Sequence, residues 1–362
     1  MDASSPRYAR QRALVGLGAE GQERLAAAHV VVVGAGGLGS AVIPALAAAG
    51  VGELTIVDDD EVDVTNLHRQ TLHSPADIGR TKAESAAEAV AALSPETVVH
   101  AEPVRFDAAS ALALILDADL LVDASDNTAT RYLANDVAAV RGIPLVWGSA
   151  VGWSGQAGVA WDARGVDYRD LFPVEPDADP ASCETLGVLP TVCTVIGGIM
   201  AGEALKLLTG SGEPLLGRAV EFDGRTGRTR ELEYRREAGA PRPGSIEERT
   251  AERVPDETHN LTPRQLEALI ASGEEFVLLD VREPHEAEIA SLPGSVLIPL
   301  GELPFRIGEL DSDAPTVVYC HHGFRSSQAL GLLRAQGFAE AGHLTGGIDA
   351  WAREVDPSMA RY

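Results

Sequence analysis

The sequence predicts two α/β domains joined by a flexible linker, and three observations lead to this prediction. A glycine-rich turn lies between a strand pattern and a helix pattern at residues 29–50. A charged, proline-containing stretch without apolar periodicity interrupts the chain at 236–257. A second, shorter α/β pattern occupies residues 258–362. We therefore expect a first domain at 1–235, a linker at 236–257 and a second domain at 258–362.

The first domain is expected to be a doubly wound sheet with helices on both faces. Four consecutive valines suit a strand buried on both faces, and the next strand ends in three acidic residues. The last helix of this domain is predicted from the apolar positions Val195, Ile199, Ala204 and Leu207. Strands are expected at 29–33, 53–60, 97–103, 120–124 and 144–148, and helices at 41–50, 82–93, 131–141 and 192–208.

The second domain repeats an α/β pattern on a smaller scale. Strands are expected at 276–282 and 316–320, and helices at 261–272 and 326–337. Thr262 and Pro263 provide a typical start for the first of these helices.

Composition narrows the classes of function. Hydrophobic residues make up 45% of the 362 residues, enough for a sizeable core. A formal net charge of −25 would repel nucleic acid and anionic membranes, so we expect neither as a partner. There is no signal-peptide core and no run of about 18 apolar residues to span a membrane. Three cysteines cannot build a disulfide framework, so we expect the reducing cytoplasm.

The glycine-rich turn is a candidate phosphate site. Gly34, Gly36 and Gly39 follow the G-x-G-x-x-G pattern, which lets the backbone approach a phosphate at a helix N-terminus. This pattern alone is weak, because a tight turn also explains it. Asp58 lies 19 residues beyond Gly39 at a strand end, where a carboxylate can accept hydrogen bonds from ribose. The two acidic residues after Asp58 could equally form a solvated loop.

Two cations favour a nucleoside triphosphate over a dinucleotide. Arg69 and Lys82 follow Asp58, together with Asn66 and Gln70. Cations stabilise charge at an α-phosphate as pyrophosphate leaves, whereas hydride transfer has little use for them. Lys82 is one of only two lysines in the chain. For Arg69, a surface ion pair with the nearby acids is the alternative.

The segment LVDASDN at 121–127 ends a strand with two further carboxylates. Asp123 and Asp126 lie at the carboxyl edge where open α/β sheets bind ligands, and a carboxylate there could hold Mg²⁺. Asp123 has an alternative role as a buried acid satisfied by backbone N–H groups.

Each of the three cysteines has a different expected role. Cys193 lies among apolar residues of the 192–208 helix and is expected in the core. Cys183 precedes that helix, where a thiolate would be nucleophilic, although an ordinary small side chain is the alternative. Cys320 leads a short loop into a helix, so convergent N–H groups and Arg325 would stabilise a thiolate or persulfide.

The first domain resembles the ubiquitin-activating-type adenylyltransferases, and most closely their molybdopterin-synthase and thiamine-biosynthesis branch. The ordered motifs are RYARQ (7–11), GAGGLGS (34–40), VDDDEVDVTNLHRQ (57–70), IGRTK (78–82) and DASDN (123–127). The resemblance covers about residues 5–235. It implies a Rossmann-like ATP-binding domain that adenylates the C-terminal glycine of a ubiquitin-like sulfur carrier protein ending in Gly-Gly.

The same resemblance implies roles for individual residues. Arg69 and Lys82 would act on the triphosphate with Asn66, and Asp126 would hold Mg²⁺. Arg10 would reach the ATP of the other subunit of a homodimer. The residues expected to bind ATP are Gly34, Gly36, Gly37, Gly39, Asp58, Asn66, Arg69, Lys82, Asp126 and Asn127. A relative's cysteine at the place of Cys183 is thought to attack the acyl-adenylate or carry sulfur.

The chain departs from the family pattern at its zinc site. Many relatives carry two Cys-x-x-Cys pairs, but this chain has Asp167 and Asp170 in place of the first pair. No cysteine lies between Cys193 and Cys320, so the second pair is absent. Because tetrahedral zinc needs about four Cys or His ligands, we expect no zinc. The actinobacterial fused branch of the family is similar in this loss.

The second domain resembles a rhodanese domain over about residues 258–356. The motifs are LLDVRE (278–283), PGSVLIPL (293–300), CHHGFRS (320–326) and LTGGIDAW (344–351). Arg325 follows Cys320 by five residues, and cysteine phosphatases need a loop one residue longer. The resemblance implies that Cys320 carries sulfane sulfur as a persulfide, and Asp280 and Arg282 are expected to hold the domain together. His321 and His322 could tune the thiolate or simply be exposed.

Together the resemblances imply carrier adenylation followed by sulfur transfer to give a thiocarboxylate. The sulfur donor would be a cysteine desulfurase or thiosulfate, and the carrier could serve molybdopterin, thiamine, cysteine or tRNA thiolation. Two alternatives are a nicotinamide oxidoreductase fused to a rhodanese domain and a binding scaffold whose sites no longer react.

Overall fold

The computed structural model describes residues 1–173, 187–236, 260–274, 276–300, 302–312, 314–321, 323–338 and 340–361. These residues form two units, one ending at Arg236 and the other beginning at Asn260. The predicted linker at 236–257 lies outside the described residues except for Arg236.

The first unit is built on one sheet, and its described strands have the order β3-β2-β1-β4-β5-β6-β7-β8. Strands β3 to β5 in this order are parallel, whereas β6, β7 and β8 pair antiparallel. The four valines of β1 are buried, as their run predicts. The bounds are β1 (His29–Val33), β2 (Glu53–Val57), β3 (Val98–Glu102), β4 (Leu120–Asp123), β5 (Leu145–Val151), β6 (Ser154–Ala160), β7 (Arg218–Asp223) and β8 (Arg228–Glu233).

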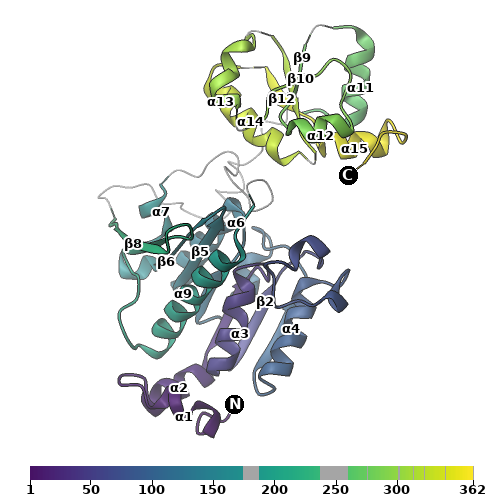
Figure 1. Cartoon of the computed structure of the whole chain (residues 1–362). Helices are drawn as coiled ribbons and strands as arrows, with labels where there is room; N and C mark the ends of the chain where they lie inside the picture. The colour runs from purple at the N-terminus through teal and green to yellow at the C-terminus, as the bar shows by residue number, and fades with distance from the viewer. Residues whose placement is uncertain are drawn as a thin grey trace. The chain divides into compact units, whose positions relative to one another are not determined.

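Helices cover both faces of this sheet, which confirms the doubly wound prediction. One face is packed by α2, α3, α4 and α9, of which α3, α4 and α9 lie side by side in Figure 1, and the other by α5, α6 and α7. The bounds are α1 (Ala9–Arg12), α2 (Gly18–Ala27), α3 (Gly39–Ala49), α4 (Lys82–Leu93), α5 (Ala111–Leu114), α6 (Thr128–Arg141), α7 (Tyr168–Leu171) and α9 (Pro190–Thr209). Short 3-10 helices occupy Pro6–Tyr8, Val64–Asn66, Pro75–Asp77 and Asp162–Arg164.

The strand order changes direction between β1 and β4. The chain runs from β1 outward to β2 and β3, then returns to the other side of β1 for β4 and β5. The connections after β1 and β4 therefore diverge, and open α/β sheets bind ligands at such a point.

Helix α9 is the core helix of the first unit. Its buried side chains include Val192, Ile196, Met200 and the predicted Ala204. Of the other predicted positions, Ile199 and Leu207 are partly buried against the core, whereas Val195 is exposed and was wrong. Among the described residues this is also the one helix long and apolar enough to cross a membrane by length and composition. Its packing on the sheet explains that composition without a membrane.

The second unit is a four-stranded parallel sheet with helices around it. The order of its described strands is β10-β9-β11-β12. The strands are β9 (Val277–Asp280), β10 (Val296–Leu297), β11 (Thr316–Tyr319) and β12 (Ala341–His343). The helices are α11 (Pro263–Ser272), α12 (Pro284–Ile289), α13 (Leu303–Arg306), α14 (Phe324–Ala335) and α15 (Gly347–Glu354), with a 3-10 helix at Ile307–Glu309.

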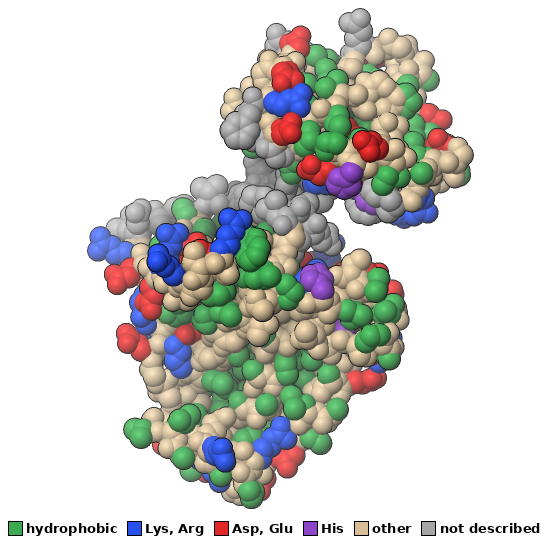
Figure 2. Space-filling view, in the orientation of Figure 1, with side chains coloured by type: hydrophobic (Ala, Val, Ile, Leu, Met, Phe, Trp, Pro, Cys, Tyr) green, Lys and Arg blue, Asp and Glu red, His purple; other side chains and the backbone are tan. Residues whose placement is uncertain are grey.

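Charge is spread over the surface in small pairs. On the face drawn in Figure 2, Lys and Arg side chains lie among acidic ones. Arg230 with Glu221, and Arg218 with Glu231, are such exposed pairs on β7 and β8. Pairs of this kind contribute little to stability, about 0–1 kcal/mol each.

Candidate functional site

The glycine turn after β1 is shaped by close backbone contacts. Gly34 has a φ of 96°, and a Cβ at this position would lie 2.7 Å from the carbonyl oxygen of Ala124. A Cβ at Gly39 would lie 2.2 Å from the carbonyl oxygen of Gly34. Both positions therefore require glycine. The turn leads directly into α3 and contacts the segment that follows β4.

Asp58 follows β2 and is hydrogen-bonded to this turn. Its carboxylate accepts hydrogen bonds from the backbone N–H of Ala35 at 2.7 Å and of Asp60 at 3.0 Å. Burial raises the pKa of Asp58, while nearby Lys82 and these two hydrogen bonds oppose the rise. Each carboxylate oxygen has a second lone pair, so the predicted hydrogen bonds to ribose remain available.

Lys82 begins α4 and reaches back to the same segment. Its Nζ lies 2.8 Å from Oδ2 of Asp60, and its backbone N–H donates to the carbonyl of Asp60. The Lys82 side chain is buried, whereas that of Asp60 is mostly exposed. Asp60 is therefore a counter-ion for Lys82 rather than only part of a solvated acidic loop.

Asn66 and Arg69 lie on the connection between β2 and α4. Asn66 caps the short helix at 64–66 through the backbone N–H of Asp63. The Arg69 guanidinium donates to the carbonyl of Thr65, and its side chain also lies close to Gly37. Arg69 makes no ion pair with the described part of the chain, so the surface ion-pair alternative finds no support there.

The DASDN segment separates two carboxylates with different roles. Asp123 is fully buried, pairs with Arg131 at 2.8 Å and accepts hydrogen bonds from Ser125, so the buried-acid alternative is confirmed. Asp126 is exposed, and it has no hydrogen bond or ion pair within the described ranges. Asn127 caps α6 by accepting from the backbone N–H of Thr130 at 2.8 Å.

His73 is a site-supporting residue that sequence reasoning missed. Its Nε2 lies 2.9 Å from the carbonyl oxygen of Ala35, and its Nδ1 lies 2.8 Å from the hydroxyl of Ser85. Ser85 is one turn into α4 from Lys82, so His73 ties the glycine turn to the helix that carries the lysine. Burial lowers the pKa of His73. Only its place within the motif-rich stretch could have drawn attention to it.

Cys193 is buried in the core as predicted, but it also supports the glycine turn. A Cβ at Gly37 would lie 2.9 Å from the Cys193 sulfur. Burial raises the pKa of this thiol, against the effect of Arg69, so it is poorly suited to act as a nucleophile.

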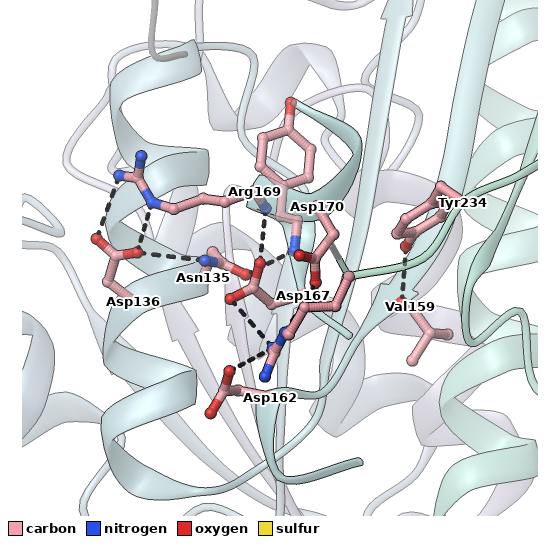
Figure 3. A network of polar contacts seen from close by, with 10 residues as sticks. Asn135, Asp136, Val159, Asp162, Asp167, Arg169, Asp170 and Tyr234 are labelled. Carbon is pink, nitrogen blue, oxygen red and sulfur yellow. Dashed lines mark hydrogen bonds and ion pairs between the residues drawn. The ribbon is translucent and has the colours of Figure 1, made fainter. Parts of the chain in front are cut away.

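The residues in place of the family's first zinc pair form ion pairs and helix caps instead. The Asp167 and Asp170 side chains accept hydrogen bonds at the start of α7 (Figure 3). The Arg236 guanidinium lies 2.5 Å from Asp162, 3.4 Å from Asp170 and 3.8 Å from Asp167. A cation already compensates these carboxylates, and the donors are oxygens rather than sulfur or imidazole. These residues therefore do not fit a structural zinc.

The roles implied for Arg10 and Cys183 stay predictions. Arg10 lies exposed on α1. Cys183 lies outside the described residues, so its role stays a prediction from the sequence.

Cys320 opens the second candidate site. It directly follows β11, is buried, and its Sγ accepts a hydrogen bond from the backbone N–H of Gly323 at 3.1 Å. Gly323 has a φ of 102°, which lets the loop turn over the sulfur. The loop is braced from behind, because Ile348 donates to the carbonyl of Cys320 and Asp349 to that of His321. His322 lies outside the described residues.

Arg325, expected to add a fixed positive charge beside Cys320, is held in place by an acidic partner. Its guanidinium forms a bidentate ion pair with the Glu286 carboxylate on α12, with N–O distances of 2.5 and 2.6 Å. Glu286 therefore balances the charge inside the domain and aligns the guanidinium. Sequence reasoning missed Glu286 because it lies 39 residues away in the chain.

Asp280 and Arg282 hold the domain together, as expected. Both are buried, and Arg282 donates to both carboxylate oxygens of Asp280 and to the carbonyl of Ala290. The guanidinium also lies over the ring of Tyr319, 5.3 Å from its centre.

Comparison with known proteins identifies both domains. Residues 8–241 match the model of the ThiF family, and residues 262–354 match that of the rhodanese-like domain. The chain is 40% identical to the probable adenylyltransferase/sulfurtransferase MoeZ of Mycobacterium tuberculosis, covering 98% of this chain and 95% of that protein. It is 34% identical to the adenylyltransferase and sulfurtransferase UBA4 of Yarrowia lipolytica, again covering 98% and 95%.

Solved structures resemble the first unit in fold. A crystal structure of E. coli MccB with succinimide superimposes with a TM-score of 0.58 at 21% identity, covering 66% of this chain and 74% of that one. The nicotinamide oxidoreductase alternative gains no support from any of these matches. The chain belongs to the ThiF family, and within it to the adenylyltransferase/sulfurtransferases that carry a C-terminal rhodanese-like domain.

Proposed function

We propose that the first domain uses ATP to adenylate the C-terminal glycine of a ubiquitin-like sulfur carrier, and that Cys320 supplies sulfur to the product. One observation carries this proposal: the glycine turn, the Asp58–Lys82 connection and the DASDN segment follow β1, β2 and β4, which are neighbours in the sheet. All three therefore meet at the carboxyl edge where a nucleotide would lie.

In the adenylation step, a carrier carboxylate oxygen attacks the α-phosphorus of ATP, and pyrophosphate leaves with the electron pair. The attacking carboxylate is already ionised at about pH 7, so no general base is needed. Arg69 and Lys82 would stabilise the charge on the phosphates together with Asn66. Asp58 would hold the ribose while the backbone of the glycine turn approaches the phosphates.

The exposed carboxylate of Asp126 would hold Mg²⁺, with Asn127 beside it. An oxygen donor open to solvent suits this ion, which keeps several of its waters. When bound, Mg²⁺ neutralises phosphate charge.

In the sulfur-transfer step, the terminal sulfur of a Cys320 persulfide attacks the acyl-adenylate and displaces AMP. The product is an acyl disulfide between the carrier and Cys320. A second thiolate then attacks the Cys320 sulfur, which releases the carrier thiocarboxylate and leaves a disulfide for a cellular thiol to reduce. Cys183 is the candidate for this second thiol within the chain. The reducing cytoplasm is the compartment expected for this chemistry.

We also propose that the enzyme works as a homodimer in which Arg10 reaches the partner's ATP. The segment after α1 supports this proposal, because Leu14 and Val15 are exposed beside Arg10. Mixing Arg10→Ala chains with Lys82→Ala chains should restore carrier-dependent pyrophosphate exchange. One of the two sites in the mixed dimer then has both Arg10 and Lys82. No restoration would place Arg10 in its own subunit's site.

The test of the proposed function is carrier-dependent exchange of pyrophosphate into ATP. Purified protein with a carrier ending in Gly-Gly should show exchange, and a carrier lacking that ending should not. Exchange without any carrier, or binding of NAD(H) in place of ATP, would contradict the proposal. A scaffold with inert sites would give neither exchange nor sulfur transfer.

A further inference from the structure

A half-buried histidine, His343, lies behind the sulfur loop of the second domain. Ser326, in the first turn of α14, is fully buried, and its hydroxyl oxygen lies 3.6 Å from the Cys320 sulfur. In the structure this hydroxyl donates to the carbonyl oxygen of Gly323 at 2.9 Å, and its oxygen also lies 3.3 Å from Nδ1 of His343. Cys320, Ser326 and His343 therefore form a continuous row of polar groups across the loop.

The surroundings of His343 favour its neutral form. His343 ends β12, the edge strand of the sheet next to β11, and Asn260 accepts from its backbone N–H. The charged side chain that acts on it is Arg334 of α14, and Cys320 is the other titratable group in the row. Burial lowers the pKa of His343, a hydrogen bond to the backbone of Gly323 opposes this, and Arg334 adds to the lowering, so the neutral imidazole is favoured.

We propose that His343 is a positioning residue for sulfur transfer that acts through Ser326 and takes up the Cys320 proton when sulfur is loaded. This inference rests on the proposed sulfur transfer at Cys320. Cys320 itself is the catalytic residue, and Ser326 touches its reacting sulfur. Because Cys320 is buried, little water is near its thiol to receive the proton, and a neighbouring imidazole can receive it instead.

The step balances with thiosulfate as the donor. The Ser326 hydroxyl turns from the Gly323 carbonyl toward Nδ1 of His343 and gives its proton there, as the Cys320 thiol proton passes to the Ser326 oxygen. The resulting thiolate attacks the sulfane sulfur of thiosulfate and forms the new S–S bond. The old S–S bond breaks, and sulfite leaves with its electron pair. Cys320 becomes a persulfide, and the proton on His343 later returns to solvent.

The experiment uses the full-length protein and measures two rates between about pH 5 and 8. One is Cys320 persulfide formation from thiosulfate, and the other is Cys320 alkylation by iodoacetamide, both followed by peptide mass spectrometry. His343→Asn keeps a hydrogen-bond acceptor near Ser326 but cannot take up a proton. His285→Asn is the matched control, because His285 is an exposed histidine of the same domain.

In the wild type, both rates should fall as acid protonates His343. In His343→Asn only the pH dependence of the thiol itself should remain, and the rates at about pH 7 should drop about tenfold or more. His285→Asn should match the wild type. Unchanged rates and an unchanged pH profile in folded His343→Asn would overturn the inference. If the wild type alkylates with the expected profile but never forms a persulfide, sulfur transfer fails while the role of His343 stands.

Discussion

Replacing Arg236 by alanine should destabilise the first domain measurably. Arg236 lies near the end of that domain and joins it to α7 through Asp162, Asp167 and Asp170. The Asp170 side chain is fully buried and that of Asp167 nearly so, whereas Arg236 is 32% exposed. Removing the guanidinium would take a cationic partner away from two buried carboxylates.

The expected size lies between two limits. Breaking a fully buried ion pair costs about 3–5 kcal/mol, and losing an exposed pair costs about 0–1 kcal/mol. With the cation partly exposed, we expect a loss of about 2 kcal/mol in the free energy of unfolding. For a domain of this size that corresponds to a fall of about 4–8 °C in melting temperature.

Differential scanning calorimetry can resolve the transition of the first domain from that of the second. The matched control is Arg235→Ala, because Arg235 is the adjacent, exposed arginine. Arg236→Lys should restore only part of the stability, since an ammonium lacks the planar fork of the guanidinium. Equal melting temperatures for Arg236→Ala and Arg235→Ala would refute the reasoning. A strong loss of stability on chelation would show that zinc is present after all.

Three further predictions concern the active sites. Lys82→Ala should lower pyrophosphate exchange about 10²–10³-fold. Cys320→Ala should keep pyrophosphate exchange and lose thiosulfate sulfurtransferase activity. A Cys320→Ala protein that still transfers sulfur would contradict the role given to Cys320. Gly37→Ala should cost about 1–3 kcal/mol by overpacking against the Cys193 sulfur, and adding Cys193→Ala should recover most of it; purely additive losses in calorimetry would speak against that contact. Burial lowers the pKa of His73 below 6.5, so the unfolded chain binds a proton at His73 more readily than the folded chain. The neutral imidazole therefore adds to the free energy of unfolding above that pH, and this contribution is lost as the pH falls below it. His73→Gln should therefore show a smaller acid-induced fall in melting temperature than the wild type, and an equal fall would argue against a buried neutral imidazole.

The sequence was sufficient to predict features that depend on neighbours in the chain. Four valines predicted the buried β1, and the spacing from Gly39 to Asp58 predicted the turn and strand end that the structure brings together. The Lys82 helix and the Cys320 loop were also found in this way, because each motif continues directly from a strand or into a helix.

Contacts between distant segments could not be predicted in the same way. Glu286 balances Arg325, and His343 lies behind Cys320, although their sequence separations carry no periodic signal. Val195 was wrongly placed on the buried face of α9 because nearly every residue of that helix is apolar, so hydrophobicity alone does not distinguish its faces. Arg236 was likewise assigned to the linker, since a single arginine gives no sign of its partners.

Adenylation of the carrier's C-terminal carboxylate is the step on which sulfur transfer depends. The most direct measurement is mass spectrometry of a Gly-Gly carrier after incubation with the protein, ATP, Mg²⁺ and thiosulfate. We predict exchange of one carboxylate oxygen for sulfur at the C-terminus, with AMP and pyrophosphate formed in step, and no exchange when ATP is omitted. Sulfur incorporation without ATP, or an unmodified tail with every Gly-Gly carrier offered, would contradict the account.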